Sequence, residues 1–261
     1  MRADQLLVER RLATTRSQAQ RLIASGVRWR VGEQAWQAVT KNGDDLPAHA
    51  ELVLQDNAEA RYVSRGGLKL EGALRDSGLQ VQGLRCLDVG QSTGGFTDCL
   101  LQHGAAQVVG LDVGHSQLHP RLREDARVVC VEHLNARELQ ANDARIPQGE
   151  LGFDVIVADV SFVSLTKVLP HVLPFLRAHG QCLLLVKPQF ELQPADIGKG
   201  GLVKDPARYN AVRERMQQAC DGLGLTLWGY WPSAIAGGDG NQEFWMAARR
   251  YDALDQEGAR R

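Results

Sequence analysis

The stretch RCLDVGQSTGGFTDCLL, residues 85–101, decides the fold of this chain. Its first part, Arg85–Val89, has the composition of a buried strand, and Gly95–His103 has the spacing of a helix. A glycine-rich turn joins the two. Such a turn presents backbone N–H groups to a ligand at the carboxyl edge of a parallel sheet. The spacing DxGxxTGG differs from the GxGxxG that binds dinucleotides.

Acidic residues around this turn indicate which ligand it binds. Asp88 would repel a pyrophosphate, whereas a carboxylate there suits the ammonium group of S-adenosylmethionine. Asp112 ends the next strand, where it can accept hydrogen bonds from both ribose hydroxyls. We therefore predict S-adenosylmethionine as cofactor, with a nicotinamide cofactor or a turn without any ligand as alternatives. The predicted cofactor-binding residues are Asp88, Gly90, Ser92, Thr93, Gly94, Gly95, Phe96, Asp112, Val113 and Asp159.

Strands and helices alternate from Leu84 onward, which is typical of a parallel sheet with helices on both faces. We therefore predict an α/β chain whose Rossmann-like domain, residues 67–252, has a seven-stranded and mostly parallel sheet. A flexible tail is expected at 253–261. The predicted strands are 85–89, 107–112, 127–131, 154–159, 182–187, 226–231 and 243–249, and the predicted helices are 68–76, 95–103, 165–178 and 206–223.

Residues 1–59 predict a separate, small α+β domain, followed by a linker at 60–66. Helices are expected at 4–11 and 17–25, and short strands at 27–31, 34–39 and 51–54. The first thirty residues contain seven arginines against only Asp4 and Glu9, although the whole chain has a formal net charge of −1. This local excess of positive charge is the kind of surface that binds nucleic acid.

Four polar residues are expected to converge at the carboxyl edge of the sheet. Asp159 and Lys187 each end an apolar strand, Glu243 begins the last strand, and Lys69 lies on the helix that enters the domain. Methyl transfer to a ribose 2′-hydroxyl needs proton removal and an in-line approach. A lysine serves as that base only where desolvation or cationic neighbours favour its neutral form. We therefore predict Lys187 as the base, with the two carboxylates positioning the lysines.

The composition argues against several other classes of protein. No apolar run reaches the roughly 18 residues that span a membrane, and the charged N-terminus has no signal-peptide core. The five cysteines are scattered without a CxxC pair, so we expect reduced thiols in a cytoplasmic protein and no metal site. A pore-forming protein is disfavoured because no segment is convincingly amphipathic.

These residues together resemble the hemolysin-A (TlyA) family of ribosomal RNA ribose methyltransferases. The catalytic domain also resembles the wider FtsJ-like group, whose Lys-Asp-Lys-Glu tetrad maps onto Lys69, Asp159, Lys187 and Glu243. The stretch RADQLLVERRLATTRSQAQRLIASG (2–26) resembles the αL RNA-binding module of ribosomal protein S-four. The stretches that carry the first resemblance are SRGGLKL (64–70), LDVGQSTGGFTDCLL (87–101), LDVGHSQL (111–118), ADVSFVSL (158–165), LVKPQFE (185–191), GKGGLVKD (198–205) and GNQEFW (240–245).

The resemblance implies 2′-O-methylation of cytidine in ribosomal RNA, with the N-terminal module holding the RNA or the ribosomal subunit through its phosphates. Gln91 replaces the small residue that is common in the loop, and Trp29 lies where the module usually has a small-residue turn. A docking protein with a weak methyltransferase fold is the alternative, and pseudouridine synthesis is disfavoured by the loop. The implied RNA-binding residues are Arg2, Arg10, Arg11, Arg16, Arg21, Arg28, Arg30 and Arg65.

Overall fold

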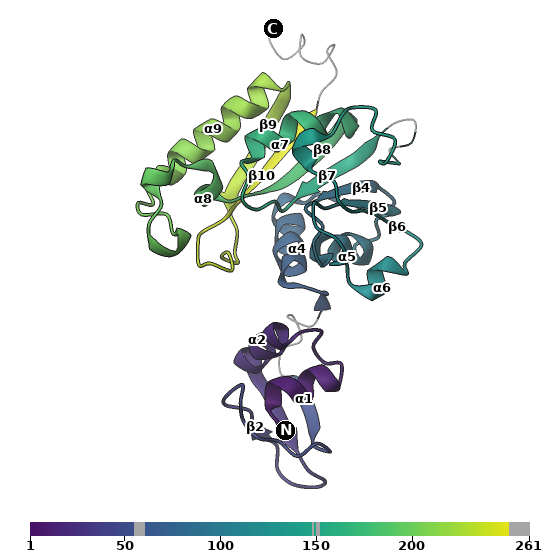
Figure 1. The fold of residues 1–261 in the computed structure, drawn as a ribbon, viewed down its shortest axis with the longest axis vertical. Helices are drawn as coiled ribbons and strands as arrows, with labels where there is room; N and C mark the ends of the chain where they lie inside the picture. Colours follow the sequence, from purple (N-terminus) through teal and green to yellow (C-terminus); the bar gives the residue numbers. More distant parts are fainter. Residues whose placement is uncertain (55–60, 148, 150–151, 251–261) are drawn as a thin grey trace. The chain divides into compact units, whose positions relative to one another are not determined.

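The computed structural model describes residues 1–54, 61–147, 149 and 152–250. The chain divides into two compact units, Met1–Leu68 (unit 1) and Lys69–Arg261 (unit 2), whose elements are drawn in Figure 1. The expected tail at 253–261 and the first residue of the expected linker lie outside the described residues. No described helix combines the length and the apolar character needed to cross a membrane.

Unit 1 is a small α+β structure. Helices α1 (Ala3–Glu9) and α2 (Arg16–Gly26) precede a three-stranded antiparallel sheet with the order β2-β1-β3. Thr15 caps α2 by accepting a hydrogen bond of 3.1 Å from the backbone N–H of Gln18. Apolar residues of both helices bury against the sheet to form the core of the unit. The strands are β1 (Val27–Arg30), β2 (Gln37–Ala38) and β3 (Glu51–Leu54).

Unit 2 contains a seven-stranded sheet with the order β6-β5-β4-β7-β8-β10-β9. The first five strands in this order pair in parallel, and β10 is antiparallel to both neighbours. The predicted seven-stranded, mostly parallel sheet is thereby confirmed. The strands are β4 (Arg85–Val89), β5 (Gln107–Leu111), β6 (Val128–Val131), β7 (Phe153–Ala158), β8 (Leu176–Val186), β9 (Leu225–Pro232) and β10 (Phe244–Arg250).

Helices cover both faces of this sheet, as Figure 1 shows. The helices α7 and α9 pack with Leu87, Ile156 and Leu184 on one face. On the other face Phe96 of α5 contacts Trp245 of β10, with ring centroids 5.7 Å apart. Burial on both faces explains why these strands are almost continuously apolar in sequence. The helices are α4 (Arg65–Ser77), α5 (Gly95–Gln102), α6 (Pro120–Arg123), α7 (Leu165–Val172), α8 (Pro188–Glu191) and α9 (Arg208–Gly222).

The strand order reverses between β4 and β7, which are adjacent although β5 and β6 intervene in sequence. In open α/β sheets this switch point forms a crevice at the carboxyl ends of the strands. Gly90 follows β4, Asp112 follows β5, and Asp159 follows β7. The topology therefore brings these three residues to one edge of the sheet.

The structure corrects three of the predicted elements. The predicted helix 165–178 ends as α7 at Val172, and a 3₁₀ turn (Leu173–Phe175) leads directly into β8. Proline inside and after the helix removes backbone donors, and pairing of Leu176 with Phe153 favours the strand there. The predicted strand 34–39 is only Gln37–Ala38, because a longer turn follows β1. Arg65 and Gly66, assigned to the linker, begin α4.

Candidate active site

The glycine-rich turn after β4 is shaped by close packing against the end of β7. Gly90 has a φ of +85° and donates its N–H to the carbonyl of Leu111 at 2.9 Å. A Cβ at this position would lie 2.5 Å from the carbonyl oxygen of Asp159. Only glycine combines this backbone conformation with this approach. The turn therefore holds the ends of β4, β5 and β7 against one another.

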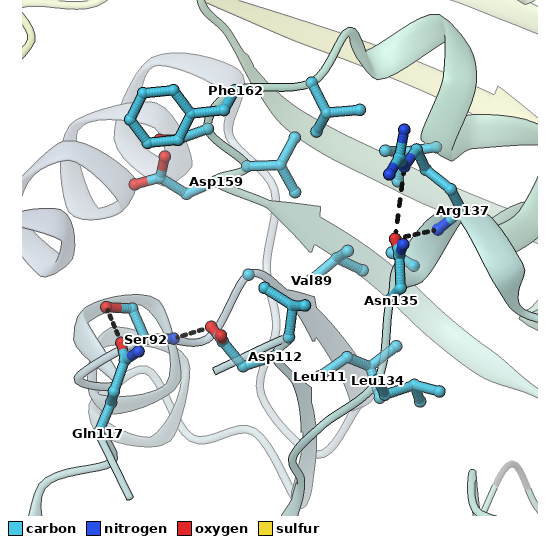
Figure 2. Close-up of a pocket in the computed structure, with 17 residues that line it drawn as sticks. Val89, Ser92, Leu111, Asp112, Gln117, Leu134, Asn135, Arg137, Asp159 and Phe162 are labelled. Atoms are coloured by element: carbon cyan, nitrogen blue, oxygen red, sulfur yellow. Dashed lines mark hydrogen bonds between the residues drawn. The ribbon is translucent and has the colours of Figure 1, made fainter. Parts of the chain in front are cut away.

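Asp112 is held in a fixed orientation by two backbone amides. Its Oδ2 accepts from the N–H of Ser92 at 2.6 Å, and its Oδ1 accepts from the N–H of Gly114 at 2.7 Å. Figure 2 shows the first of these bonds beside the cavity that Asp112 lines. Each carboxylate oxygen keeps further acceptor capacity. Asp112 can therefore accept hydrogen bonds from the hydroxyls of a ligand without rearranging.

A cavity of about 380 Å³, called cavity 1 here, opens at this edge of the sheet. Figure 2 shows the carboxylates of Asp112 and Asp159 on one side of it and Asn135 with Arg137 on the other. The floor is apolar and includes Leu111 and Leu134. A volume of this size with an apolar floor and few polar groups fits a nucleoside-sized ligand.

Half of the predicted cofactor-binding residues line cavity 1, and half lie outside its lining. Those that line it are Gly90, Ser92, Asp112, Val113 and Asp159. Gly94 has a φ of +94° and packs against α6, where a Cβ would lie 2.3 Å from Leu122. Phe96 is buried on the opposite face of the sheet against Trp245. The predicted residues outside the lining are Asp88, Thr93, Gly94, Gly95 and Phe96.

Asp88 is completely buried beneath the turn rather than exposed in the cavity. Thr97 donates a hydrogen bond of 2.7 Å from Oγ1 to Oδ2 of Asp88, and Gln91 donates one of 2.9 Å from Nε2 to Thr97. The Oδ1 atom has no hydrogen-bond partner among the described residues. Burial, followed by the nearby charges of Asp159 and Asp112, raises the pKa of Asp88 to about 7. A cationic ligand nearby would stabilise this carboxylate in its charged form.

The side chain of Gln91 points inward, away from cavity 1. It is 3% exposed and lies over Gly110 of β5. The departure from a small residue that the sequence flagged at this position therefore affects the packing beneath the turn. Cavity 1 is lined by the neighbouring Gly90 and Ser92 instead.

The four polar residues predicted to be catalytic come together as two ion pairs. Lys69 of α4 donates a hydrogen bond from Nζ to Oε2 of Glu243. The Nζ atom of Lys187 lies 2.5 Å from Oδ1 of Asp159 and donates a hydrogen bond of 2.8 Å to Oγ of Ser161. The carboxyl ends of β7 and β8 place the second pair, and the start of β10 places Glu243.

The electrostatics of this group connect the two pairs. Glu243 is 2% exposed, and its burial raises its pKa. The charges of Lys69 and Lys187 oppose that rise, whereas Asp159 adds to it. The two lysines and two carboxylates have a formal charge of zero when all are ionised, which reduces the free-energy cost of burying them.

A second cavity of about 450 Å³, called cavity 2, adjoins cavity 1. It is lined by Lys187 and Glu243, and both cavities share Ser161 and Phe162. Asp159 belongs to the wall of cavity 1, so the Asp159–Lys187 pair connects the two cavities. A group carried by a ligand in cavity 1 can therefore pass to a hydroxyl in cavity 2, with an amine beside the acceptor.

Sequence reasoning missed several residues of the cavities. Leu134, Asn135 and Arg137 line cavity 1 from the segment after β6. The same strand-end logic, applied to the next parallel strand, would have found them. Phe162 is 91% exposed with a φ of +63° and lines both cavities, and no sequence pattern identified it.

The arginine side chains of unit 1 differ in the hydrogen bonds and ion pairs that they make within the protein. Arg2 and Arg16 both pair with the buried carboxylate of Asp4, and Arg30 pairs with Glu51. Arg10, Arg21 and Arg28 donate to backbone carbonyls. The side chains of Arg11 and Arg65 make no hydrogen bond or ion pair with another described residue. Trp29 is half-buried and packs against the core of the unit.

The described residues contain no group of three His, Cys, Asp or Glu side chains placed to hold a metal ion.

Comparison with known proteins identifies the family. The chain is 41% identical to the 16S/23S rRNA (cytidine-2′-O)-methyltransferase TlyA of Mycobacterium tuberculosis, over 98% of this chain and 93% of that protein. It is 44% identical to YqxC of Bacillus subtilis, named as a candidate rRNA methyltransferase, over 93% of this chain and 83% of that protein.

A solved structure from Streptococcus thermophilus, named as a candidate hemolysin, superposes with a TM-score of 0.73. It is 38% identical and covers 97% of this chain and 89% of its own. The model of the FtsJ-like methyltransferases matches residues 62–250. This chain belongs to the FtsJ-like methyltransferase family.

Proposed function

We propose that this protein transfers a methyl group from S-adenosylmethionine to the 2′-hydroxyl of a cytidine ribose in ribosomal RNA. The observation that carries the proposal is the Asp159–Lys187 ion pair, which connects cavity 1 to cavity 2. A relative named as an rRNA (cytidine-2′-O)-methyltransferase at 41% identity supports the choice of substrate.

The residues of cavity 1 fit S-adenosylmethionine. Asp112 is oriented to accept from two ribose hydroxyls, and the apolar floor around Leu134 suits an adenine ring. The close approach of Gly90 to the backbone of Asp159 holds the ends of β4 and β7 together in the wall of this cavity. The carboxylates of Asp112 and Asp159 in the wall make cavity 1 attractive to a cationic ligand. The cofactor supplies an electrophilic methyl group on a sulfonium.

Lys187 is the proposed base. Its amine lines cavity 2 beside Ser161, within reach of a hydroxyl placed there. In its neutral form it would take the 2′-hydroxyl proton onto Nζ, so that the oxygen could bond to the methyl carbon while the methyl–sulfur bond breaks and its electrons stay on a neutral thioether. Asp159 holds this amine by the ion pair and also faces cavity 1.

Lys69 and Glu243 are proposed to position the acceptor. Their pair is buried, and Glu243 reaches the wall of cavity 2. Without Lys69, Glu243 would be a buried carboxyl group without its ion-pair partner. It would then favour its protonated form, or compete with Asp159 for an ion pair with Lys187. The pair thus holds Glu243 in place beside cavity 2, where it can accept a hydrogen bond from the substrate.

Phe162 is proposed as a stacking surface for a nucleobase. A non-glycine residue at positive φ is strained, and a phenylalanine with 91% of its area exposed gains little from folding. Its ring lies 5.3 Å from that of Phe190, and both line cavity 2. Aromatic side chains of this kind stack on unpaired bases in RNA-binding sites.

Unit 1 is proposed as the RNA-binding domain. This keeps the roles that the sequence indicated, with residues 1–59 binding RNA and residues 60–66 linking them to the methyltransferase domain. Its exposed arginines would contact phosphates, which position RNA without reading its sequence. Arg11 and Arg65 have no competing partner among the described residues and are the first candidates for such contacts.

The test is transfer of a labelled methyl group from S-adenosylmethionine to purified ribosomal subunits, followed by mass spectrometry of the nucleosides. The proposal expects 2′-O-methylcytidine with the wild type and its loss with Lys187→Ala. Binding of the cofactor without incorporation into either subunit would support the docking alternative. A methylated base instead of a methylated ribose would overturn the proposed reaction.

A further inference from the structure

A third cavity lies next to the proposed acceptor site and has a different chemical character. This cavity 3, of about 330 Å³, is lined by the cationic side chains Arg137, Lys167 and Arg215. It shares Arg137 and Phe162 with cavity 1, and Phe162 and Phe190 with cavity 2. The three cavities are therefore contiguous around the Phe162–Phe190 pair.

The carboxylate in cavity 3 is already engaged by the protein. Glu191 is 4% exposed and accepts hydrogen bonds from Oγ of Ser164 and, at 2.7 Å, from the N–H of Leu165. The Nε atom of Arg215 lies 3.7 Å from Oε2 of Glu191, and Arg215 also donates at 2.8 Å to the backbone carbonyl of Glu191. Glu191 and Arg215 thus neutralise each other at the floor of the cavity.

The other two cations keep their charge. Lys167 is exposed on α7, and its ammonium makes no hydrogen bond or ion pair with another described residue. Among the described residues, the guanidinium of Arg137 has only the neutral amide oxygen of Asn135 as a partner, at 3.5 Å. Cavity 3 therefore carries a net charge of about +2 from an arginine and a lysine, which together suit a phosphate group.

The position of cavity 3 indicates which phosphate it takes. A ribose in cavity 2 has a backbone phosphate on each side, and Phe162 and Phe190 line both cavity 2 and cavity 3. The backbone amides at the start of α7 are already used by Glu191 and Ser164, so the attraction comes from the side chains. We propose that Arg137 and Lys167 in cavity 3 bind the RNA backbone phosphate next to the methylated nucleotide. This inference rests on the proposed function.

Lys167 is the residue to change, because Arg137 also lines cavity 1. The experiment measures the steady-state kinetics of methyl transfer to ribosomal subunits for the wild type, Lys167→Ala and Lys167→Arg. Arg177→Ala is the control for a general loss of positive charge, since Arg177 is an exposed cation at the start of β8, at the opposite edge of the sheet, where it pairs with Asp154. Lys167→Ala is expected to raise KM for the RNA about tenfold with an unchanged kcat. In this variant the slope of log KM against the logarithm of the salt concentration should be smaller by about 0.7, which is the contribution of one phosphate contact on a single strand.

The remaining outcomes separate this inference from the proposed function. Affinity for S-adenosylmethionine should match the wild type in every variant, and Lys167→Arg should restore most of the lost RNA affinity. An active wild type with an unchanged KM and salt slope in Lys167→Ala would overturn the phosphate site alone. The same loss in Arg177→Ala would also overturn it, because the effect would then be general electrostatics. A wild type that methylates no ribosomal RNA would instead refute the proposed function, and this inference with it.

Discussion

The amide of Gln91 lies against Gly110, so closely that a Cβ at position 110 would be 2.0 Å from its Nε2 atom. The same amide donates to Thr97, which donates to the buried carboxylate of Asp88. Gly110→Ala is therefore expected to displace the amide and break this chain. Overpacking of this kind costs about 1–3 kcal/mol of unfolding free energy. Urea unfolding of the variant measures it.

A double-mutant cycle checks the cause of that loss. Replacing Gln91 with Ala removes the side chain that the new methyl group would meet, so Gly110→Ala should cost almost nothing in the Gln91→Ala background. An equal cost in both backgrounds would show that the strand itself rejects the methyl group.

Lys187→Ala should lower kcat for methyl transfer by about 10²–10⁴-fold, because it removes the amine beside the acceptor hydroxyl. Affinity for S-adenosylmethionine, measured by calorimetry, should change little, since Lys187 lines cavity 2 and not cavity 1. Asp112→Ala is the matched control and should weaken cofactor binding instead. Wild-type activity in Lys187→Ala would rule this lysine out as the base.

The buried Asp88 predicts a specific dependence of stability on pH. Its pKa is raised to about 7, whereas an aspartate in the unfolded chain ionises near 3.9. Between these values the folded state binds more protons, so the contribution of Asp88 is fully present below about pH 4 and is lost as the pH rises through 7. Asp88→Asn cannot ionise and should lose less stability than the wild type between pH 5 and pH 8. The free energy of unfolding of both proteins is measured by urea unfolding across this pH range. If the two plots against pH are parallel, the raised pKa of Asp88 is contradicted.

Because the arginines of unit 1 differ in their contacts within the protein, we expect their replacement by alanine to have unequal effects on RNA affinity. The side chain of Arg11 makes no hydrogen bond or ion pair with another described residue. A guanidinium nitrogen of Arg16, by contrast, lies 3.0 Å from Oδ2 of the buried Asp4. Hydrogen bonds from Arg2 and then Arg16 hold the pKa of that carboxyl well below its usual range. Arg11→Ala should reduce the salt dependence of RNA binding by about 0.7–0.9 in slope, and Arg16→Ala by less.

A stability measurement accompanies that comparison. Arg16→Ala should lower the Tm of the protein, because it leaves a buried carboxylate with one partner fewer, and Arg11→Ala should not. If Arg16→Ala leaves the Tm unchanged and reduces the salt slope as much as Arg11→Ala, the ion pair does not hold this arginine.

Phe162→Ala should impair catalysis without harming the fold. The ring is 91% exposed, and alanine keeps the same backbone conformation, so the Tm should change little. Loss of one stacked base is worth about 1–3 kcal/mol, which corresponds to roughly a 5- to 150-fold loss in kcat/KM for RNA. Phe162→Trp keeps a stacking surface and should retain most activity. Normal kcat/KM in Phe162→Ala would exclude the stacking role.

Local signals predicted the fold well where each element depends on its own residues. The turn from β4 to α5 was readable because Gly90, Gly94 and the apolar strand are contiguous. The helix expected over 165–178 was wrong in its second half because Leu176 pairs with Phe153 of a neighbouring strand. Helical spacing cannot report a strand partner that lies elsewhere in the sequence.

The sequence by itself determined which residue types gather at the carboxyl edge of the sheet, because strand ends are readable from apolar runs. Asp112, Asp159 and Lys187 follow from that rule. Only the tertiary structure decided the direction of each side chain. Asp88 faces beneath the turn rather than into cavity 1, and Lys69 meets Glu243 across 174 positions. Contacts of this kind depend on strand order and packing, which no short stretch of sequence contains.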